Sequence, residues 1–263
     1  LQLRDFNSLW VELRPHGRPC INPILLEELN RLPAALQYYS KSCNRTTHLV
    51  LHSTRPGIFS LGGDLDLFKR LIEAQDKETL LAYGLACVDI VYNAASGYGD
   101  NIISYALVQG DALGGGMETA LTADYVVMEE QARMGLPEVL FNLFPGMGAA
   151  TLLKRRLLEG TLSKVLRIIE SGNIFSAQEL HEMGLCHQVA PSGEGENVLM
   201  AIIQHNETQL NALKMMGKAR KIVNPLDKEE MVDIVKIWVD TALQLTPRDL
   251  RLMDLLIKRQ TKY

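Results

Sequence analysis

The sequence lacks the patterns that mark several large classes of protein. It contains no apolar run of about 18 residues, so we expect no transmembrane helix. Its 27 basic and 31 acidic residues give a net charge of −4, which provides no overall basic field for nucleic acid or anionic lipid. The first residues, LQLRDFNSLW, have neither the basic nor the apolar region of a secretory signal. We therefore expect neither nucleic acid nor membrane as a partner.

Cysteine and histidine are few and scattered. The four cysteines, Cys20, Cys43, Cys87 and Cys186, form no C-x-x-C pair. The six histidines form no H-x-x-x-H or H-E-x-x-H pattern. These absences predict reduced thiols in a cytoplasmic protein that has no metal site.

Segments typical of strands alternate with segments typical of helices over most of the chain. The strand-like segments cover residues 9–15, 47–54, 101–111 and 124–130, with helical patterns between them. This alternation predicts an α/β fold with parallel strand pairing. The turn-rich segment PSGEGEN predicts a boundary between an α/β core, residues 1–195, and a helical region, residues 196–263. The helical region is too small to stand alone, so we expect it to pack on the core or on a neighbouring subunit.

Two glycine clusters precede predicted helices. They are FSLGGDLDLF, residues 59–68, and LGGGMETAL, residues 113–121. The first turn of a helix has free backbone N–H groups, and glycine lets a ligand approach them without meeting a Cβ atom. Each cluster alone is better interpreted as a tight turn. Together they could aim two N–H groups at one oxygen, as an oxyanion hole does for a thioester.

Other motifs for catalysis at such turns are absent. Neither cluster fits G-x-x-x-x-G-K-[ST] or G-x-G-x-x-G, and the serine hydrolase pattern G-x-S-x-G does not occur. Glu118 follows the second cluster, and Glu138 follows Pro137 in an apolar stretch. Helix capping explains either glutamate alone. Apolar surroundings would raise the pKa of Glu138, and two carboxyl groups near an oxyanion hole can act as acid and base.

The segments GIFSLGGDLDLF, ALVQGDALGGGMETALTADYVV and MGLPEVLFNLFPGMGAATLL resemble the crotonase superfamily of enoyl-CoA hydratases and isomerases. With SGNIFSAQELHEMGLCHQVAP, the resemblance covers roughly residues 8–195. It implies a spiral of repeated ββα units, followed by C-terminal helices that support a homotrimer or a dimer of trimers. It also implies an acyl thioester substrate and no cofactor.

The resemblance implies roles for particular residues. Glu118 and Glu138 would be catalytic, and the N–H groups of Leu61 and Gly115 would form the oxyanion hole. Further expected contacts with the substrate are Gly62, Gly63, Asp64, Gly114, Met117, Leu136, Leu140 and Phe141. The apolar run of residues 136–144, with Met117 and Met134, lines an acyl tunnel or belongs to the core. Arg55, Lys69, Arg70 and the cluster Lys154, Arg155 and Arg156 meet the phosphates or acidic protein of a carrier, or form solvated faces.

Two segments, VLFNLFPGMGAA and RPCINPILLEEL, look like the diffusible signal factor synthases within that superfamily. This implies dehydration of a 3-hydroxyacyl thioester of acyl carrier protein and release of a cis-2-unsaturated fatty acid. One alternative is an enoyl-CoA hydratase of fatty-acid metabolism. An alternative of another class is a non-catalytic scaffold or RNA-binding protein with the same fold.

Overall fold

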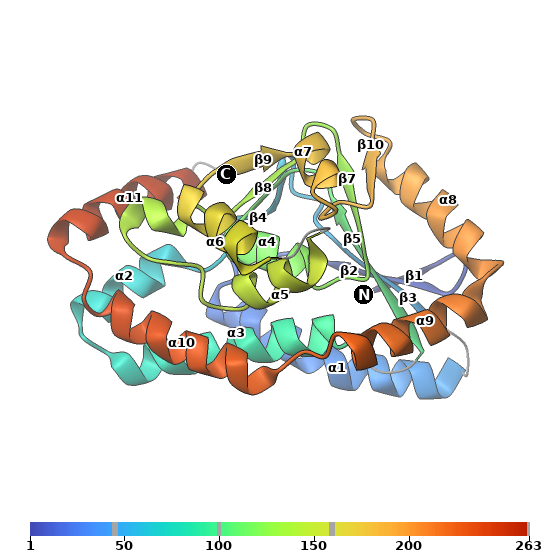
Figure 1. The fold of residues 1–263 in the computed structure, drawn as a ribbon, viewed down its shortest axis with the longest axis horizontal. Helices are drawn as coiled ribbons and strands as arrows, with labels where there is room; N and C mark the ends of the chain where they lie inside the picture. The colour runs from blue at the N-terminus through green and yellow to red at the C-terminus, as the bar shows by residue number, and fades with distance from the viewer. Residues whose placement is uncertain (44–46, 99–100, 158–160, 262–263) are drawn as a thin grey trace.

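Two β-sheets form the centre of the molecule, and helices surround them (Figure 1). The computed structural model describes residues 1–43, 47–98, 101–157 and 161–261. The larger sheet has the order β1-β2-β3-β5-β7-β10, and the smaller has the order β4-β6-β8-β9. Only the pairs β1–β2 and β8–β9 are antiparallel among the described strand pairs. The predicted parallel pairing is therefore confirmed.

The strands are short apart from those at the middle of the larger sheet. The larger sheet consists of β1 (Gln2–Arg4), β2 (Ser8–Glu12), β3 (Thr47–His52), β5 (Ile102–Val108), β7 (Tyr125–Glu129) and β10 (Gln188–Ala190). The smaller sheet consists of β4 (Ile58–Ser60), β6 (Asp111–Leu113), β8 (Arg133–Gly135) and β9 (Ile174–Ser176). Every residue of β5 is buried, as expected for a parallel strand covered on both faces.

Consecutive strands alternate between the two sheets from β3 to β8, and a helix follows each pair of strands. The helices in this part are α1 (Pro23–Cys43), α2 (Leu65–Glu73), α3 (Lys77–Ala95), α4 (Gly115–Ala120), the 3₁₀ helix η1 (Pro137–Phe141), α5 (Ala149–Arg156), α6 (Leu162–Ser171) and α7 (Ala177–Glu182). This arrangement confirms the predicted spiral of ββα units.

The C-terminal helices are α8 (Gly195–Glu207), α9 (Leu210–Val223), α10 (Lys228–Ala242) and α11 (Pro247–Thr261). Helix α10 lies beside α3, and its buried side chains Met231, Val235 and Trp238 belong to the main hydrophobic core (Figure 1). Helix α9 differs, because none of its side chains is buried against the rest of the chain. The helices from α8 onward begin at Gly195, and buried side chains of α8, α10 and α11 pack on the rest of the chain.

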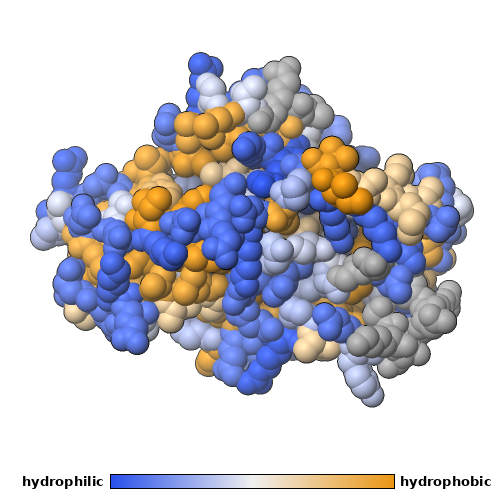
Figure 2. Space-filling model, turned by 60° about the horizontal axis from the view of Figure 1, so that its bottom comes forward, coloured by the Kyte–Doolittle hydropathy of each residue, from blue (hydrophilic) through white to orange (hydrophobic). Residues whose placement is uncertain are grey.

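The apolar surface is distributed unevenly over the molecule. Figure 2 shows hydrophobic residues gathered toward the side of the molecule where α2, α10 and α11 lie in Figure 1, with hydrophilic side chains crossing them.

No helix in the described part of the chain is both long and apolar enough to cross a membrane.

Candidate active site

The two glycine clusters meet at one edge of the smaller sheet. Strands β4 and β6 are parallel neighbours, with Ser60 opposite Ala112, so the turns that follow them leave the sheet at the same edge. A Cβ atom at Gly62 would lie 2.7 Å from the carbonyl oxygen of Leu113 and 2.8 Å from the nitrogen of Gly115. The two turns can lie this close because glycine residues follow each strand and have no side chain to separate the two backbones.

Glycine is required at both turns for conformational reasons as well as space. Gly62 has φ of +79° and Gly114 has φ of +54°, in the region that residues with a Cβ rarely adopt. At Gly116 a Cβ atom would lie 2.2 Å from the carbonyl oxygen of Ser60, so the start of α4 contacts β4 through bare backbone. The glycines therefore serve both purposes that the sequence suggested: they form tight turns, and they let another part of the backbone come close.

The hydrogen bonds of these turns show which N–H groups are free. The N–H of Leu61 donates to the carbonyl of Pro19 at 2.8 Å, and that of Gly62 donates to Ser60 Oγ at 3.3 Å. Within the described chain, the N–H groups of Gly63 and Gly115 have no acceptor. The prediction that Leu61 supplies an oxyanion N–H is therefore wrong, because that N–H is already bonded, and Gly63 supplies a free one instead.

Glu118 lies inside the protein at the first turn of α4. Its side chain is only 1% exposed, and its Oε1 accepts a hydrogen bond of 2.8 Å from the N–H of Ala149. Burial raises the pKa of this carboxyl group to about 7, although the hydrogen bonds from Ala149 and Met147 favour the charged form. The group can therefore gain or lose a proton near neutral pH.

Glu138 approaches Glu118 from η1, the 3₁₀ helix that begins at Pro137. Part of the residue reaches the surface, but its Oε2 is buried and has no hydrogen-bond partner in the described structure. Burial and the nearby charge of Glu118 raise the pKa of Glu138 to about 8. A Cβ atom at Gly114 would lie 2.5 Å from Glu138 Oε1, so this glycine makes room for the carboxyl group.

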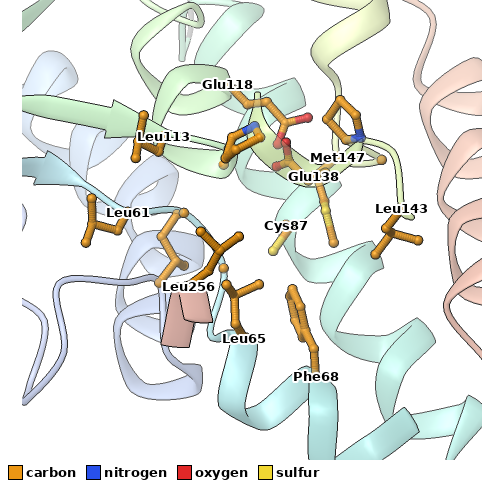
Figure 3. A pocket seen from close by; sticks show the side chains of 18 of the residues that line it. Leu61, Leu65, Phe68, Cys87, Leu113, Glu118, Glu138, Leu143, Met147 and Leu256 are labelled. Atoms are coloured by element: carbon orange, nitrogen blue, oxygen red, sulfur yellow. The ribbon is translucent and has the colours of Figure 1, made fainter. Parts of the chain in front are cut away.

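Both carboxyl groups open into one pocket, where they lie next to each other (Figure 3). The glycine turns border the same pocket, and its other walls are mainly apolar. Apolar wall residues include Leu65, Phe68, Ile90, Val91, Leu113, Leu143, Met147, Trp238 and Leu256. An apolar wall beside two carboxyl groups and two free N–H groups suits a thioester that carries a hydrocarbon chain.

The structure sorts the other predicted contacts into two groups. Gly62, Gly63, Gly114, Leu140 and Phe141 line the pocket, together with Leu61 and Gly115. Asp64, Met117 and Leu136 do not line it, and these three predictions are wrong.

Each of these three side chains has a structural role. Asp64 caps α2 by accepting a hydrogen bond from the N–H of Leu67, and it forms an ion pair with Arg18. Met117 and Leu136, like Met134, are buried in the main core.

The predicted cationic residues also lie away from the pocket lining. Lys69 pairs with Asp254, and Arg70 pairs with Asp66. Arg155 and Arg156 donate to the backbone carbonyls of Pro225 and Ala123, and Arg55 donates to that of Gly17. Lys154 is exposed on α5.

No pattern in the sequence indicated that the C-terminal helix contributes to the pocket. Arg259 and Gln260 of α11 line the pocket, far along the chain from the glycine turns. Arg259 is exposed and forms no hydrogen bond or ion pair with any described residue. The regular helical pattern of α11 predicts a helix but does not indicate which of its residues reach the pocket.

Neither a metal nor a reactive thiol is indicated by the described residues. Among them, no group of three or more His, Cys, Asp and Glu side chains is placed to hold a metal ion. Cys87 lines the pocket, but burial raises the pKa of its thiol far above the usual range, so the reactive thiolate is disfavoured.

Known proteins are similar to this sequence over most of the chain. The family model for enoyl-CoA hydratase/isomerase matches residues 14–233. A probable mitochondrial enoyl-CoA hydratase 2 of Arabidopsis thaliana is 28% identical over 83% of this chain and 70% of its own length. A probable enoyl-CoA hydratase of Rhizobium meliloti is 28% identical over 78% of this chain and 74% of its own length.

Solved structures agree at the level of the fold. The crystal structure of enoyl-CoA hydratase from Bacillus halodurans is similar with a TM-score of 0.78 at 16% identity, covering 97% of this chain and 98% of that one. The match of the family model over most of the sequence, together with this fold, confirms the resemblance to the crotonase superfamily. The chain therefore belongs to the enoyl-CoA hydratase/isomerase family.

Proposed function

We propose that this protein is a lyase that adds water across the α,β double bond of a 2-enoyl thioester and catalyses the reverse dehydration. The observation that carries the proposal is the pair of buried carboxyl groups, Glu118 and Glu138, beside the free N–H groups of Gly63 and Gly115. Relatives named enoyl-CoA hydratase support hydration of a coenzyme A thioester, which the sequence offered as an alternative.

In the proposed reaction, the N–H groups and the two carboxyl groups act in successive steps. The thioester oxygen accepts hydrogen bonds from Gly63 and Gly115, which lie on adjoining turns: a Cβ atom at Gly115 would lie 3.5 Å from the Gly63 nitrogen. One carboxylate takes a proton from water as the water oxygen bonds to the β-carbon. The π electrons of the double bond move toward the thioester oxygen and form an enolate. The other carboxyl group gives its proton to the α-carbon, which restores the carbonyl and leaves a 3-hydroxyacyl thioester.

The raised pKa values of the two glutamates explain how one site holds an acid and a base at once. With pKa values of about 7 and about 8, the pair retains about one proton near neutral pH. Which glutamate carries it is a property of the pair, so the two roles are not divided between the residues. Dehydration follows the same path backward, with the α-proton removed and the 3-hydroxyl group leaving as water.

Arg259 offers a contact for the carrier of the acyl group. It is an exposed cation that lines a mainly apolar pocket, and it has no partner among the described residues. Coenzyme A and acyl carrier protein both present a phosphate beyond the thioester arm, so Arg259 suits either carrier. Arg259, rather than the cationic residues predicted from the sequence, is thus our proposed contact for the phosphate of the carrier.

A spectrophotometric assay with 2-enoyl thioesters on coenzyme A and on acyl carrier protein tests the proposal. We expect loss of enoyl absorbance and formation of the 3-hydroxyacyl thioester, unaffected by a chelator because no cofactor is predicted. The same samples are tested for free acid. A cis-2-unsaturated acid formed only from a 3-hydroxyacyl carrier protein would instead support the diffusible signal reaction. No turnover of either thioester would contradict the proposal and favour a non-catalytic scaffold.

We also propose that the protein forms a homotrimer or a dimer of trimers. Helix α9 packs no buried side chain against its own chain, yet it exposes Met216, Ile222 and Val223. Exposed apolar residues grouped on one helix are typical of a protein interface.

A further inference from the structure

The C-terminal helix reaches back to the first glycine turn through one buried side chain. Gln260 of α11 is 3% exposed, and its Nε2 donates to the carbonyl oxygens of Leu61 at 2.9 Å and Gly63 at 3.0 Å. Its orientation is fixed, because exchanging the amide nitrogen and oxygen would place Oε1 against two carbonyl oxygens. Oε1 itself is buried without a partner in the described structure.

The two hydrogen bonds from Gln260 hold the peptide groups before and after the Gly62–Gly63 peptide, which carries the free N–H. The peptide between Gly62 and Gly63 supplies that N–H, and its carbonyl accepts a hydrogen bond of 2.7 Å from the N–H of Ile21. Gln260 holds the peptide before it and the peptide after it. In this turn, the N–H of Gly63 is thus the polar backbone group that the described residues leave without a partner.

Helix α11 is itself held by the elements that build the site. Its Asp254 forms an ion pair of 2.7 Å with Lys69 of α2, the helix that follows the first glycine turn. Its Asp249 accepts a hydrogen bond of 3.3 Å from Asn142, the residue that ends η1 and so follows Glu138. The position of Gln260 is therefore fixed relative to both the oxyanion turn and the glutamate-bearing helix.

We propose that Gln260 is a positioning residue for the oxyanion hole, which orients the Gly63 N–H toward the thioester oxygen. This inference rests on the proposed function. A donor that is already oriented stabilises the enolate without reorganisation, whereas a mobile peptide loses part of that stabilisation. Without the Gln260 amide, the carbonyls of Leu61 and Gly63 lose their partner, and the turn can rotate toward other arrangements.

The test compares wild type with Gln260→Met, which keeps the length of the side chain but removes its donors. Gln260→Glu keeps the shape and polarity and replaces the donors with an acceptor. Lys258→Met, an exposed residue in the same helical turn, is the control. We expect kcat to fall roughly 10- to 100-fold in Gln260→Met, with KM changed less than about threefold, and to fall at least as far in Gln260→Glu. Lys258→Met should behave as wild type.

A second readout separates positioning from a purely structural role. A saturated acyl thioester with a ¹³C-labelled carbonyl cannot be hydrated, so its carbonyl stretching frequency can be measured while it is bound. We expect wild type to lower this frequency and both Gln260 variants to lower it less, at temperatures where each variant is folded. A lower melting temperature with wild-type kcat and frequency would overturn the inference.

The results distinguish this inference from the proposed function. If wild type turns over enoyl thioesters and Gln260→Met does so within about twofold of it, the positioning role is wrong and the function stands. If wild type lowers the carbonyl frequency but catalyses no hydration, the proposed function fails while loss of that shift in Gln260→Met still supports positioning.

Discussion

The two glutamates control the chemistry at the scale of single residues because each lies where a charge is costly. Burial raises the pKa of Glu118 to about 7, and burial with the neighbouring charge raises that of Glu138 to about 8. The sequence predicted both residues and the raised pKa of Glu138. It did not predict that Glu118 would be buried more fully than Glu138, which follows from the contact of α4 with α5.

The pKa values predict a bell-shaped pH dependence of kcat. Below about pH 7 both carboxyl groups become protonated and the base is lost, whereas above about pH 8 both become charged and the acid is lost. We expect a maximum between these values, measured as the initial rate of hydration at saturating substrate. A rate that is constant from pH 5 to 9, a range of roughly two units on either side of neutral, would contradict this account.

The same groups should make the folded protein less stable as pH rises. Their folded pKa values exceed 4.5, the ordinary value, so between pH 4.5 and about 8 the folded state keeps protons that the unfolded state has lost. The free energy of unfolding then falls by up to about 1.4 kcal/mol per pH unit for each retained proton. Urea unfolding at several pH values should show a shallower decline in Glu118→Gln. Equal slopes would indicate that Glu118 titrates normally.

Gly62 provides a second residue-scale prediction. A methyl group there would lie 2.8 Å from the Gly115 nitrogen, so Gly62→Ala should close the oxyanion hole and lower kcat/KM by about 100-fold or more. Gly193→Ala is a matched control, because Gly193 has the same φ of +79° and no atom within 4 Å of an added Cβ. Both variants carry the backbone strain, but we expect only Gly62→Ala to lose activity. Equal losses would attribute the effect to strain.

At the scale of elements, the site depends on where short segments end. Helix η1 ends at Phe141, and its C-cap residue Asn142 adopts φ of 62° and donates a hydrogen bond to Asp249 of α11. This left-handed residue turns the chain back immediately after the segment that carries Glu138. Asparagine tolerates that conformation better than residues with larger apolar side chains.

Asn142→Leu should therefore displace Glu138. The left-handed conformation costs a leucine about 1–2 kcal/mol, and the hydrogen bond to Asp249 is lost as well. We expect a lower melting temperature and a lower kcat, measured by thermal unfolding and by the hydration assay. Asn142→Gly keeps the backbone conformation and should retain more activity than Asn142→Leu. The reverse order would exclude a role for the turn.

The sequence predicted elements better than contacts between them. Strand and helix periodicity predicted an α/β fold with parallel pairing, and the two glycine clusters predicted two turns that could meet. The resemblance to the crotonase superfamily implied the spiral of ββα units. Leu61 was chosen wrongly because its N–H bonds to Pro19, and no local pattern reports that contact. Gln260 and Arg259 were missed for the same reason, since α11 reaches the pocket only through tertiary packing.

At the scale of the whole molecule, α9 exposes apolar side chains that another copy of the protein could cover. Ile222 is 80% exposed and Val223 is 84% exposed, on a helix that buries none of its side chains. Its Leu210 and Leu213 are only partly buried against the core of its own chain. Contact with another copy would bury this apolar surface.

Sedimentation analysis of a double variant, Ile222→Glu with Val223→Glu, tests the assembly. We expect wild type to sediment as a trimer or larger and the variant as a smaller species, because two buried charges oppose association. Ile24→Glu replaces an exposed aliphatic residue on α1, a helix with buried side chains of its own, and should leave the mass unchanged. A monomeric wild type would contradict the proposed assembly.

The central claim is that two buried carboxyl groups act together on a thioester held by the glycine turns. The most direct test measures hydration of a 2-enoyl thioester by wild type, Glu118→Gln and Glu138→Gln, with Glu129→Gln as a control. Glu129 is also buried but contacts Gly193 and Gly195, outside the pocket. We predict that each active-site variant binds substrate but loses nearly all turnover, whereas folded Glu129→Gln keeps it. Near-normal turnover in either active-site variant would contradict the claim.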